Sequence, residues 1–430
     1  MVVPSPTSRT VALELIAAVL KNHRPLDDAL EGHAGFAGLE IRERAFARNL
    51  VATTLRRLGQ IDELINYCLQ KPLPRRAVAV RDVLRVGICQ LIFLNTPAHA
   101  AVDTAVSMLD GLDLSAYKKL VNAVLRRLGR EGGKLMEAQD EERLNTPDWL
   151  WRSWSNAYGK DACRDIATAH LCEPPLDITA LKDSDVWAET LDAVILPTGS
   201  LRLAKSTNVT KLPGFDEGAW WVQDAAAALP VALLGDVQGK HVIDLCAAPG
   251  GKTAQLLSRG ARVTAVERSA KRLKRLEENL DRLNLTAETV CADAANWRPE
   301  EKADAVLLDA PCSSTGTIRR HPDIPHLKKL EDVEKLSTAQ YRLFEAALDM
   351  VKPNGQIIFC TCSLQPEEGP ELVSRILVSH SLMRLDPIKP HEVGNLPELI
   401  DETGTLRCLP SHLGELGGMD GFFAARLVFG

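Results

Sequence analysis

The stretch Asp244-Leu-Cys-Ala-Ala-Pro-Gly-Gly-Lys-Thr253 decides the fold that we expect for the larger part of this chain. It begins inside a short apolar segment, residues 241–246, that is typical of a buried strand, and it runs into a helical stretch over 254–257. Its two glycines let the backbone pass close to a ligand. The turn matches neither the phosphate-loop pattern (GxxxxGK followed by Ser or Thr) nor the dinucleotide pattern GxGxxG. It therefore predicts a strand–turn–helix ligand site of another kind.

Four more segments rich in Val, Ile or Leu are candidate strands, and helical stretches separate them. They are residues 262–267, 288–292, 303–309 and 355–361. Alternation of strands and helices indicates a Rossmann-like α/β domain with a mostly parallel, doubly wound sheet. Ligands of such sheets lie beyond the carboxyl ends of the strands, so we expect the chemistry there.

The N-terminal part shows the pattern of an all-helical domain. Apolar residues recur at helical spacing, as in Val11, Leu15 and Val19, and strand-like alternation is absent. A polar stretch follows, and residues 175–215 look like short strands and turns. We therefore expect three parts: a helical domain over 1–135, a linker with a small α+β module over 136–217, and the α/β domain over 218–430.

The composition is that of a soluble, folded protein of two or three domains. Of the 430 residues 45% are apolar and 25% are charged, which excludes disorder, collagen and a disulfide-stapled miniprotein. No apolar run reaches the length of a membrane span, and the N-terminus lacks the layout of a signal peptide, so we expect a cytoplasmic protein. The ten cysteines are accordingly expected to be free thiols.

Charge is distributed unevenly along the chain. The net charge is −6, yet residues 1–130 carry 18 Lys and Arg against 12 Asp and Glu. Several of these positive residues form doublets, namely Arg56-Arg57, Arg75-Arg76, Lys118-Lys119 and Arg126-Arg127. This asymmetry is typical of an RNA-facing domain attached to an acidic enzyme, although solvated helix faces would produce the same pattern.

Two carboxylates follow the next strands in the positions that an adenosine-type ligand requires. Glu267 ends the second strand and is placed to bind ribose hydroxyls, and Asp293, just past the third strand, suits the adenine edge. Together with a turn that does not fit phosphate, they best match S-adenosylmethionine. For the glycine turn alone, a tight strand–helix connection without a ligand is the alternative.

Two thiols follow the fourth and fifth strands, in Asp309-Ala-Pro-Cys312 and Cys360-Thr-Cys362. Adjacent strands lie about 4.8 Å apart, so Cys312 and Cys362 are expected to converge beside Asp309, with room between the sulfurs for a flipped-out base. A thiolate can attack C6 of a pyrimidine, after which C5 accepts a methyl group and a second base removes the C5 proton. Asp309 is expected to stabilise the ring during attack. This set predicts cytosine C5 methylation and leaves open which thiol attacks.

Three alternatives stay open on the residues alone. Cys312, Cys360 and Cys362 could hold a metal, but paired CxxC motifs and a suitably spaced histidine are missing, so we expect no metal. A methyltransferase that acts on an amino nitrogen would more often carry Pro-Pro-Tyr after the fourth strand. An RNA-binding or assembly factor without activity would usually have lost a catalytic thiol or the ribose carboxylate, and both are present.

In combination these motifs resemble the RNA cytosine-5 methyltransferases of the NOL1/NOP2/Sun type. The resemblance rests on residues 244–253, 309–316, 318–323, 361–363 and 366–368, with 222–224 and 418–423 in support. Residues 86–126 are similar to the NusB-like helical domain. Such a domain joined to this catalytic domain is typical of the bacterial Sun/Fmu-type enzymes that act on small-subunit ribosomal RNA.

The resemblance implies roles for single residues. The nucleophile would be Cys362, and Cys312 would assist proton removal and product release. The cofactor contacts would be Cys246, Ala247, Ala248, Pro249, Gly250, Gly251, Lys252, Glu267, Asp293 and Asp309. Glu267 departs from many relatives, which have Asp there, but it keeps the carboxylate, and Cys360 is assigned no function.

The resemblance also implies the substrate, a cytosine of 16S ribosomal RNA. It implies no DNA or membrane partner, and no protein partner is indicated. It leaves open which cytosine is modified, whether free RNA or an assembling subunit is the substrate, which residues of the helical domain contact RNA, and the oligomeric state.

Overall fold

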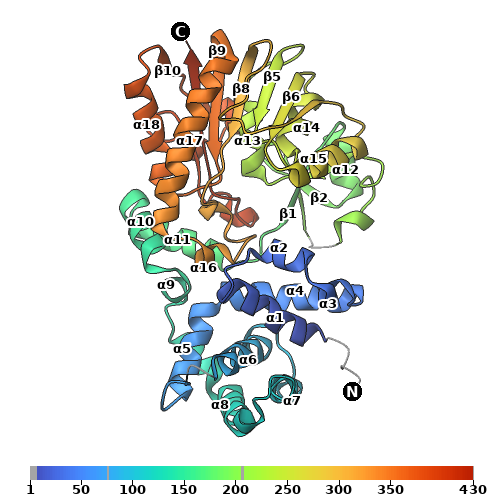
Figure 1. Ribbon diagram of the computed structural model, residues 1–430, viewed down its shortest axis with the longest axis vertical. Coiled ribbons are helices and arrows are strands. Elements are labelled where there is room, and N and C mark those ends of the chain that lie inside the picture. Colours follow the sequence, from blue (N-terminus) through green and yellow to red (C-terminus); the bar gives the residue numbers. More distant parts are fainter. Residues whose placement is uncertain (1–6, 75–76, 205–207, 430) are drawn as a thin grey trace. The chain divides into compact units, whose positions relative to one another are not determined.

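The computed structural model describes residues 7–74, 77–204 and 208–429, and the basic doublet Arg75-Arg76 lies outside these residues. Contacts along the chain divide it into two compact units (Figure 1). The helical unit comprises residues 1–172 together with 318–329, and the sheet unit comprises 173–317 and 330–430. Within the described ranges, none of the helices has both the length and the apolar character that a membrane crossing requires.

The helical unit consists of helices and short helical turns, as the sequence predicted. Its elements are α1 (Ser8–Leu20), α2 (Leu26–Glu31), α3 (Ala34–Ala37), α4 (Ile41–Arg56), α5 (Leu58–Cys68), α6 (Val78–Ile88), η2 (Cys89–Phe93), α7 (Ala98–Met108), η3 (Ser115–Tyr117), α8 (Lys118–Glu137), α9 (Glu141–Asn145), α10 (Asp148–Tyr158), α11 (Lys160–His170) and α16 (Ile324–Leu327). Helix α6 runs through the core, where Val83, Leu84 and Val86 are fully buried. The apolar stripe of each longer helix packs into this common core.

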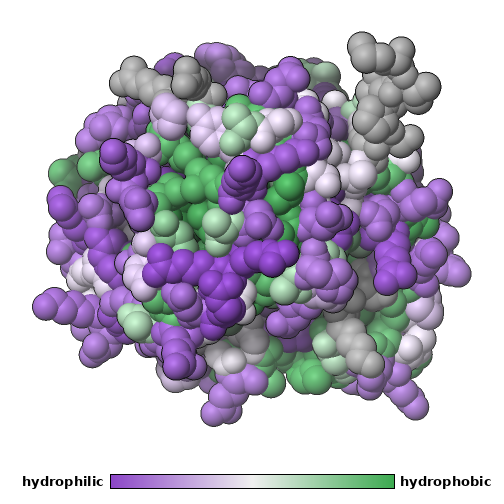
Figure 2. All heavy atoms as spheres, turned by 90° about the horizontal axis from the view of Figure 1, so that it is seen from below, coloured by the Kyte–Doolittle hydropathy of each residue, from purple (hydrophilic) through white to green (hydrophobic). Residues whose placement is uncertain are grey.

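Helix α8 separates apolar from basic side chains. Val121 and Leu125 are buried, whereas Lys119, Arg126 and Arg130 are exposed. The three basic residues are seven and four positions apart, so they share the helix face that lies opposite the buried one. The face of the molecule in Figure 2 carries mostly hydrophilic side chains around an apolar area.

One segment of the helical unit comes from far along the chain. Residues 318–329 belong to it although they stand, in sequence, between strand β8 (Ala303–Asp309) and helix α17 (Leu330–Met350) of the sheet unit. The carboxylate of Asp323 accepts a hydrogen bond from the backbone N–H of Leu26 at 2.8 Å, and the ring of His326 lies 3.0 Å from the carbonyl oxygen of Leu55. Leu327 packs against the helical core. The helical unit is therefore complete only with this returning piece of chain.

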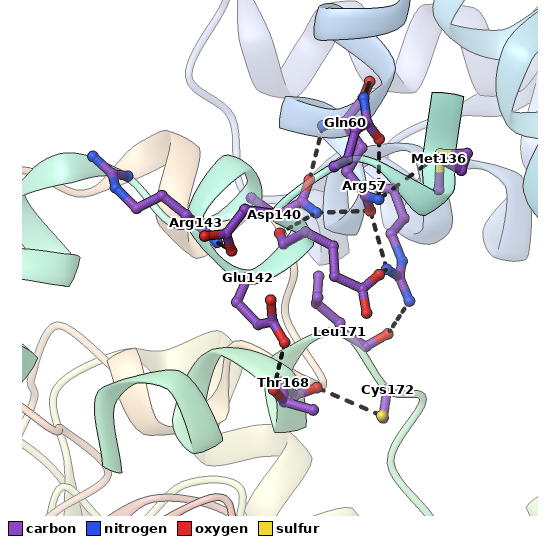
Figure 3. A network of polar contacts seen from close by, with 12 residues as sticks. Arg57, Gln60, Met136, Asp140, Glu142, Arg143, Thr168, Leu171 and Cys172 are labelled. Carbon is purple, nitrogen blue, oxygen red and sulfur yellow. Dashed lines mark hydrogen bonds and ion pairs between the residues drawn. The ribbon is translucent and has the colours of Figure 1, made fainter. Parts of the chain in front are cut away.

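Helices α9 and α11 also belong to the helical unit, and a polar network joins them to α5 and α8 (Figure 3). Arg57 binds the carboxylate of Glu141 at 2.5 Å and the carbonyl oxygen of Leu171 at 3.3 Å. Thr168 donates a hydrogen bond to Glu142 at 3.2 Å. The segment 136–217, expected as one linker and small module, is therefore divided between the two compact units, while the domain boundaries themselves stay a prediction.

The sheet unit begins with a small antiparallel sheet of the kind expected for an α+β module. It consists of β1 (Leu176–Ala180), β2 (Ala193–Ile195), β3 (Leu201–Leu203) and β4 (Trp220–Val222) in the order β2-β3-β1-β4, with α12 (Ser184–Thr190) and η4 (Val209–Lys211) beside them in sequence. The side chains of Ile178, Leu201 and Trp220 form its core. A buried ion pair at 2.7 Å between Arg202 and Asp177 joins β3 to β1.

The large sheet has the order β10-β12-β9-β8-β5-β6-β7, with β11 paired to β12. Its strands are β5 (His241–Leu245), β6 (Arg262–Glu267), β7 (Glu288–Cys291), β8, β9 (Val351–Thr361), β10 (Met383–Leu385), β11 (Leu406–Cys408) and β12 (Phe422–Phe429). The neighbours among β5 to β9 are parallel, and β10, β11 and β12 pair antiparallel. The predicted mostly parallel sheet is confirmed.

Helices and short turns connect these strands and cover both faces of the sheet (Figure 1). They are α13 (Ala225–Ala232), α14 (Gly251–Ser258), α15 (Ala270–Arg282), η5 (Thr315–Thr317), α17, η6 (Pro366–Glu368), α18 (Pro370–Ser379), η7 (Pro390–Val393), η8 (Pro397–Leu399) and η9 (Gly414–Leu416). Successive strand residues enter different cores, since Leu307 packs on one face and Leu308 on the other. This doubly wound arrangement brings the carboxyl ends of β5, β6 and β8, with the neighbouring β9, to one edge.

Candidate active site

Two sulfur atoms meet at the carboxyl ends of β8 and β9. The strands pair in parallel with Asp309 opposite Cys360, so the loops that follow them start side by side. The Sγ atoms of Cys312 and Cys362 lie 3.5 Å apart, and both side chains are partly exposed. The sulfurs converge as predicted, but the expected room between them is wrong, because at this distance they are in contact. A nucleobase cannot fit between them and would have to present one face of its ring to both sulfurs.

Hydrogen bonding makes the two thiols unequal. A proton shared by two sulfurs leaves one as donor and the other as acceptor. The hydrogen bond from Cys312 lowers the pKa of Cys362 below the ordinary value of a thiol. The same contact, together with burial, raises the pKa of Cys312. Because the thiolate is the nucleophilic form, the arrangement favours Cys362 as the attacking group.

Asp309, at the end of β8, is held by two neighbours. The ammonium group of Lys252 lies 2.8 Å from one carboxylate oxygen, and the thiol of Cys360 lies 3.6 Å from the other. Burial works against the charge of Lys252, but Asp309 raises the pKa of Lys252 above the ordinary value, so the ammonium group keeps its proton. About a third of the Asp309 side chain (32%) is exposed, which leaves it able to accept a hydrogen bond from a bound molecule.

The turn after β5 holds its backbone in an unusual conformation. Cys246 and Gly250 have φ angles of 61° and 101°, in the left-handed region. A Cβ atom on Gly250 would lie 3.0 Å from Cγ of Leu276, so glycine is required there. Arg272 of α15 donates a hydrogen bond to the carbonyl oxygen of Ala248 at 2.6 Å. The expected contact residues Cys246, Ala247, Ala248, Pro249, Gly250, Gly251 and Lys252 all lie in this turn or at the start of α14.

The two expected carboxylates lie after β6 and β7 in different surroundings. Glu267 is 2% exposed; one of its oxygens accepts a hydrogen bond from the backbone N–H of Ser269 at 2.9 Å, and the other lies 3.2 Å from Arg272. Asp293 is exposed to solvent. The assignment of both to cofactor binding, like the roles of the other expected site residues, stays a prediction.

The surroundings of a further carboxylate, Asp244, show whether S-adenosylmethionine fits the carboxyl-terminal edge of the large sheet. Asp244 of β5 is fully buried; its Oδ2 accepts a hydrogen bond from Thr253 at 2.6 Å, whereas its Oδ1 has no hydrogen-bond partner. Burial raises the pKa of Asp244 to about 7. A buried acceptor without a partner is costly, and a positively charged donor would satisfy it. The cofactor carries an ammonium group and a sulfonium group, so this residue set fits it.

The remaining cysteines have no shared site. In the described ranges of the chain, no group of three or more His, Cys, Asp and Glu side chains is arranged to hold a metal ion. Cys89, Cys163, Cys360 and Cys408 are buried, and Cys172 and Cys291 are exposed.

Glu368 is a buried carboxylate that the sequence marks only as part of the family motif over 366–368. One of its oxygens accepts hydrogen bonds from the backbone N–H of Ser313 at 2.9 Å and from the amide of Gln340 at 3.0 Å. The other accepts from the hydroxyl of Ser363 at 2.6 Å and from that of Ser313. Ser313 and Ser363 directly follow the two thiols. No spacing in the sequence shows that this glutamate points between them.

Two family models match the chain, one in each part. A model described as "16S rRNA methyltransferase RsmB/F" matches residues 231–428, and the model of the NusB family matches residues 6–130. A ribosomal RNA small subunit methyltransferase B from Pseudomonas putida is 34% identical over 441 residues, covering 98% of each chain. The protein of the same name from Vibrio vulnificus is 36% identical over 361 residues, covering 78% of this chain and 83% of its own.

Solved structures agree with the fold. The crystal structure of PH0851 matches 98% of this chain and 99% of its own, with a TM-score of 0.74 and 23% identity. The structure of NSun6 from Pyrococcus horikoshii with SFG matches 66% of this chain and 98% of its own, with a TM-score of 0.56 and 20% identity. At these identities the likeness supports the architecture of the chain.

Proposed function

Since the chain belongs to the family of the ribosomal RNA small subunit methyltransferases B, we propose that it methylates C5 of a cytosine in 16S ribosomal RNA through a covalent bond between Cys362 and C6 of the base. The chain is a methyltransferase of ribosomal RNA whose cofactor is S-adenosylmethionine. The acceptor carbon, the adduct and the roles of single residues are the proposal.

The observation that carries the proposal is the contact of 3.5 Å between the sulfurs of Cys312 and Cys362. C5 and C6 are adjacent atoms of one ring, so two sulfurs in contact can reach both from the same face of the base. Cys362 forms a bond to C6, and the electrons of the C5–C6 double bond become available at C5. S-adenosylmethionine, when bound, supplies the methyl group that C5 accepts.

Release of the product needs a base, and we assign that step to Cys312, whose sulfur contacts that of Cys362. Its thiol proton passes to solvent, its sulfur then takes the C5 proton, and the bond between C6 and Cys362 breaks to restore the double bond. Cys312 is again protonated and Cys362 is again a thiolate, so one proton is released per turnover. In this proposal Asp309 accepts a hydrogen bond from the N4 amino group of the cytosine and so orients the ring for attack.

The test uses the full chain and unmethylated small-subunit RNA. Cys362→Ala is expected to abolish incorporation of a labelled methyl group while cofactor binding stays intact. Cys312→Ala is expected to form the adduct without resolving it, so a protein–RNA band persists in a denaturing gel. Base mapping is expected to find the label at C5 of a cytosine.

Cys172→Ala is the matched control, because this thiol is exposed and lies in the helical unit. It should methylate like the unaltered chain. Full activity of Cys362→Ala, or a label on a nitrogen atom, would reject the proposal.

A further inference from the structure

The loops that carry the two thiols are joined behind the sulfurs by one carboxylate. Glu368 is fully buried in η6, and each of its oxygens accepts two of the four hydrogen bonds described above. Ser313 belongs to the loop after β8 and Ser363 to the loop after β9. Their hydroxyl oxygens lie 3.1 Å apart. The carboxylate therefore spans both loops one residue beyond each thiol.

Two further contacts fix this cluster to the rest of the sheet unit. The amide of Gln340, from α17, also donates to the carbonyl oxygen of Pro311 at 2.9 Å. Arg407 of β11 donates to the carbonyl oxygen of Ser363 at 2.7 Å. A carboxylate with donors on both oxygens keeps its charge more readily than an isolated buried acid. Burial nevertheless raises the pKa of Glu368 above the ordinary value.

The charge of Glu368 acts on the thiol of Cys312. The contact with Cys362 and burial raise the pKa of Cys312, and the negative charge of Glu368 adds to that effect. Two other charged groups, Asp309 and Lys252, act on Cys362 with opposite signs. A negative charge near Cys312 disfavours a thiolate there and leaves the anion on Cys362.

We propose that Glu368 is a positioning residue that holds the two thiol loops together and, by its charge, makes Cys312 the sulfur that keeps the shared proton. This assigns the nucleophile and the base to different cysteines before any substrate is bound. The same charge makes Cys312 a stronger base for the C5 proton. Removal of the C5 proton by Cys312 rests on the proposed function. Which of the two sulfurs holds the shared proton is a property of the free protein.

The test measures which sulfur reacts, without RNA or cofactor. The full-length protein is treated briefly with iodoacetamide at pH 7.5, and mass spectrometry of the digest gives the label on Cys312 and on Cys362. In the unaltered chain the label is expected mainly on Cys362. Glu368→Gln keeps the volume and removes the charge, and it is expected to lower the ratio of Cys362 label to Cys312 label about tenfold, which corresponds to a relative shift of one pKa unit.

Two variants separate the charge from its surroundings. Glu368→Asp keeps the charge and is expected to retain a ratio closer to that of the unaltered chain than Glu368→Gln does. Glu371→Gln removes an exposed carboxylate three residues further along and is expected to leave the ratio unchanged. Thermal unfolding of each variant identifies any that has lost its fold. If Glu368→Gln does not fold, the label ratio of Glu368→Asp is compared with that of the unaltered chain. An unchanged ratio in folded Glu368→Gln, or an equal change in Glu371→Gln, would overturn the proposal.

A second readout follows the reaction itself. Glu368→Gln is expected to lower kcat with little change in KM for S-adenosylmethionine, and to accumulate the protein–RNA adduct because Cys312 is a weaker base. A changed label ratio without any methylation at C5 would reject the proposed function and leave the role of Glu368 standing. Normal methylation at C5 by Glu368→Gln with an unchanged label ratio would reject the role of Glu368 and leave the proposed function standing.

Discussion

At the scale of single residues, Asp244 carries a buried carboxyl group whose charge changes near neutral pH. Its folded pKa of about 7 lies well above the ordinary value, because the side chain is buried and one oxygen has no partner. Below that pH the carboxyl group is neutral, and above it the group is an anion. A positively charged cofactor binds the anion better, so binding and loss of the proton are linked.

We therefore expect the affinity for S-adenosylmethionine to fall as the pH drops below 7, by up to about tenfold per pH unit for one linked proton. Asp244→Asn is neutral at every pH and should bind weakly with a flat profile between pH 5.5 and 7. Equilibrium dialysis with labelled cofactor measures both. Asp281→Asn, on an exposed position of α15, is the control and should keep the slope. A steep profile in Asp244→Asn would assign the linked proton to another group.

The positions of the candidate site residues were predictable only where a strand end places them. Asp309, Cys312 and Cys362 follow buried apolar segments directly, and parallel strands bring such ends to one edge. The contact distance of the sulfurs was not predictable, because it depends on how two loops fold back. The hydrogen bonds of Glu368 were not predictable either, since its partner Ser313 is 55 positions away in sequence.

At the scale of elements, the strands of the large sheet were the most predictable feature. Strands buried on both faces are continuous apolar runs, which is why β6 and β8 begin and end at the predicted residues. Strand β9 extends four residues further towards the N-terminus than predicted, through Val351-Lys-Pro-Asn, a polar stretch that no apolar pattern marks. The antiparallel strands β10 and β11 have only three residues each, too few for a periodic signal.

A buried ion pair between Arg202 and Asp177 joins two strands of the small sheet, and this gives a prediction for its stability. The side chains of Arg202 and Asp177 are 6% and 0% exposed. Removing one partner of a buried pair leaves an uncompensated charge, so Arg202→Met is expected to lower the free energy of unfolding by about 3–5 kcal/mol. Denaturant unfolding measures this loss.

The exposed pair of Arg262 and Glu301, with side chains 60% and 64% exposed, provides the control. Arg262→Met should change the stability little, because water and salt screen such a pair. Equal losses from both substitutions would show that burial does not decide the contribution of these pairs.

At the scale of the whole molecule, the excess of positive charge in residues 1–130 stands against an acidic remainder. The exposed row Lys119, Arg126 and Arg130 on α8 is one place where that charge gathers. Each phosphate contact releases counterions, so binding through such a row depends steeply on salt.

Replacing Lys119, Arg126 and Arg130 together by Ala is expected to weaken binding of small-subunit RNA and to reduce the slope of log K against log salt by about two to three. Filter binding over a range of salt concentrations measures the slope, and cofactor affinity should not change. Replacing Arg42, Arg44 and Arg48 of α4 removes the same charge from another helix. If both triple variants lose affinity equally, α8 is not the preferred RNA contact.

Because residues 318–329 belong to the helical unit, that unit cannot be separated from the rest of the chain by a single cut. A gene fragment that ends at residue 172 would encode a helical unit without Leu327 in its core and without the carboxylate that binds Leu26. Recombination at a single crossover could not exchange that unit intact. Any graft of the helical unit should therefore carry residues 318–329 with it.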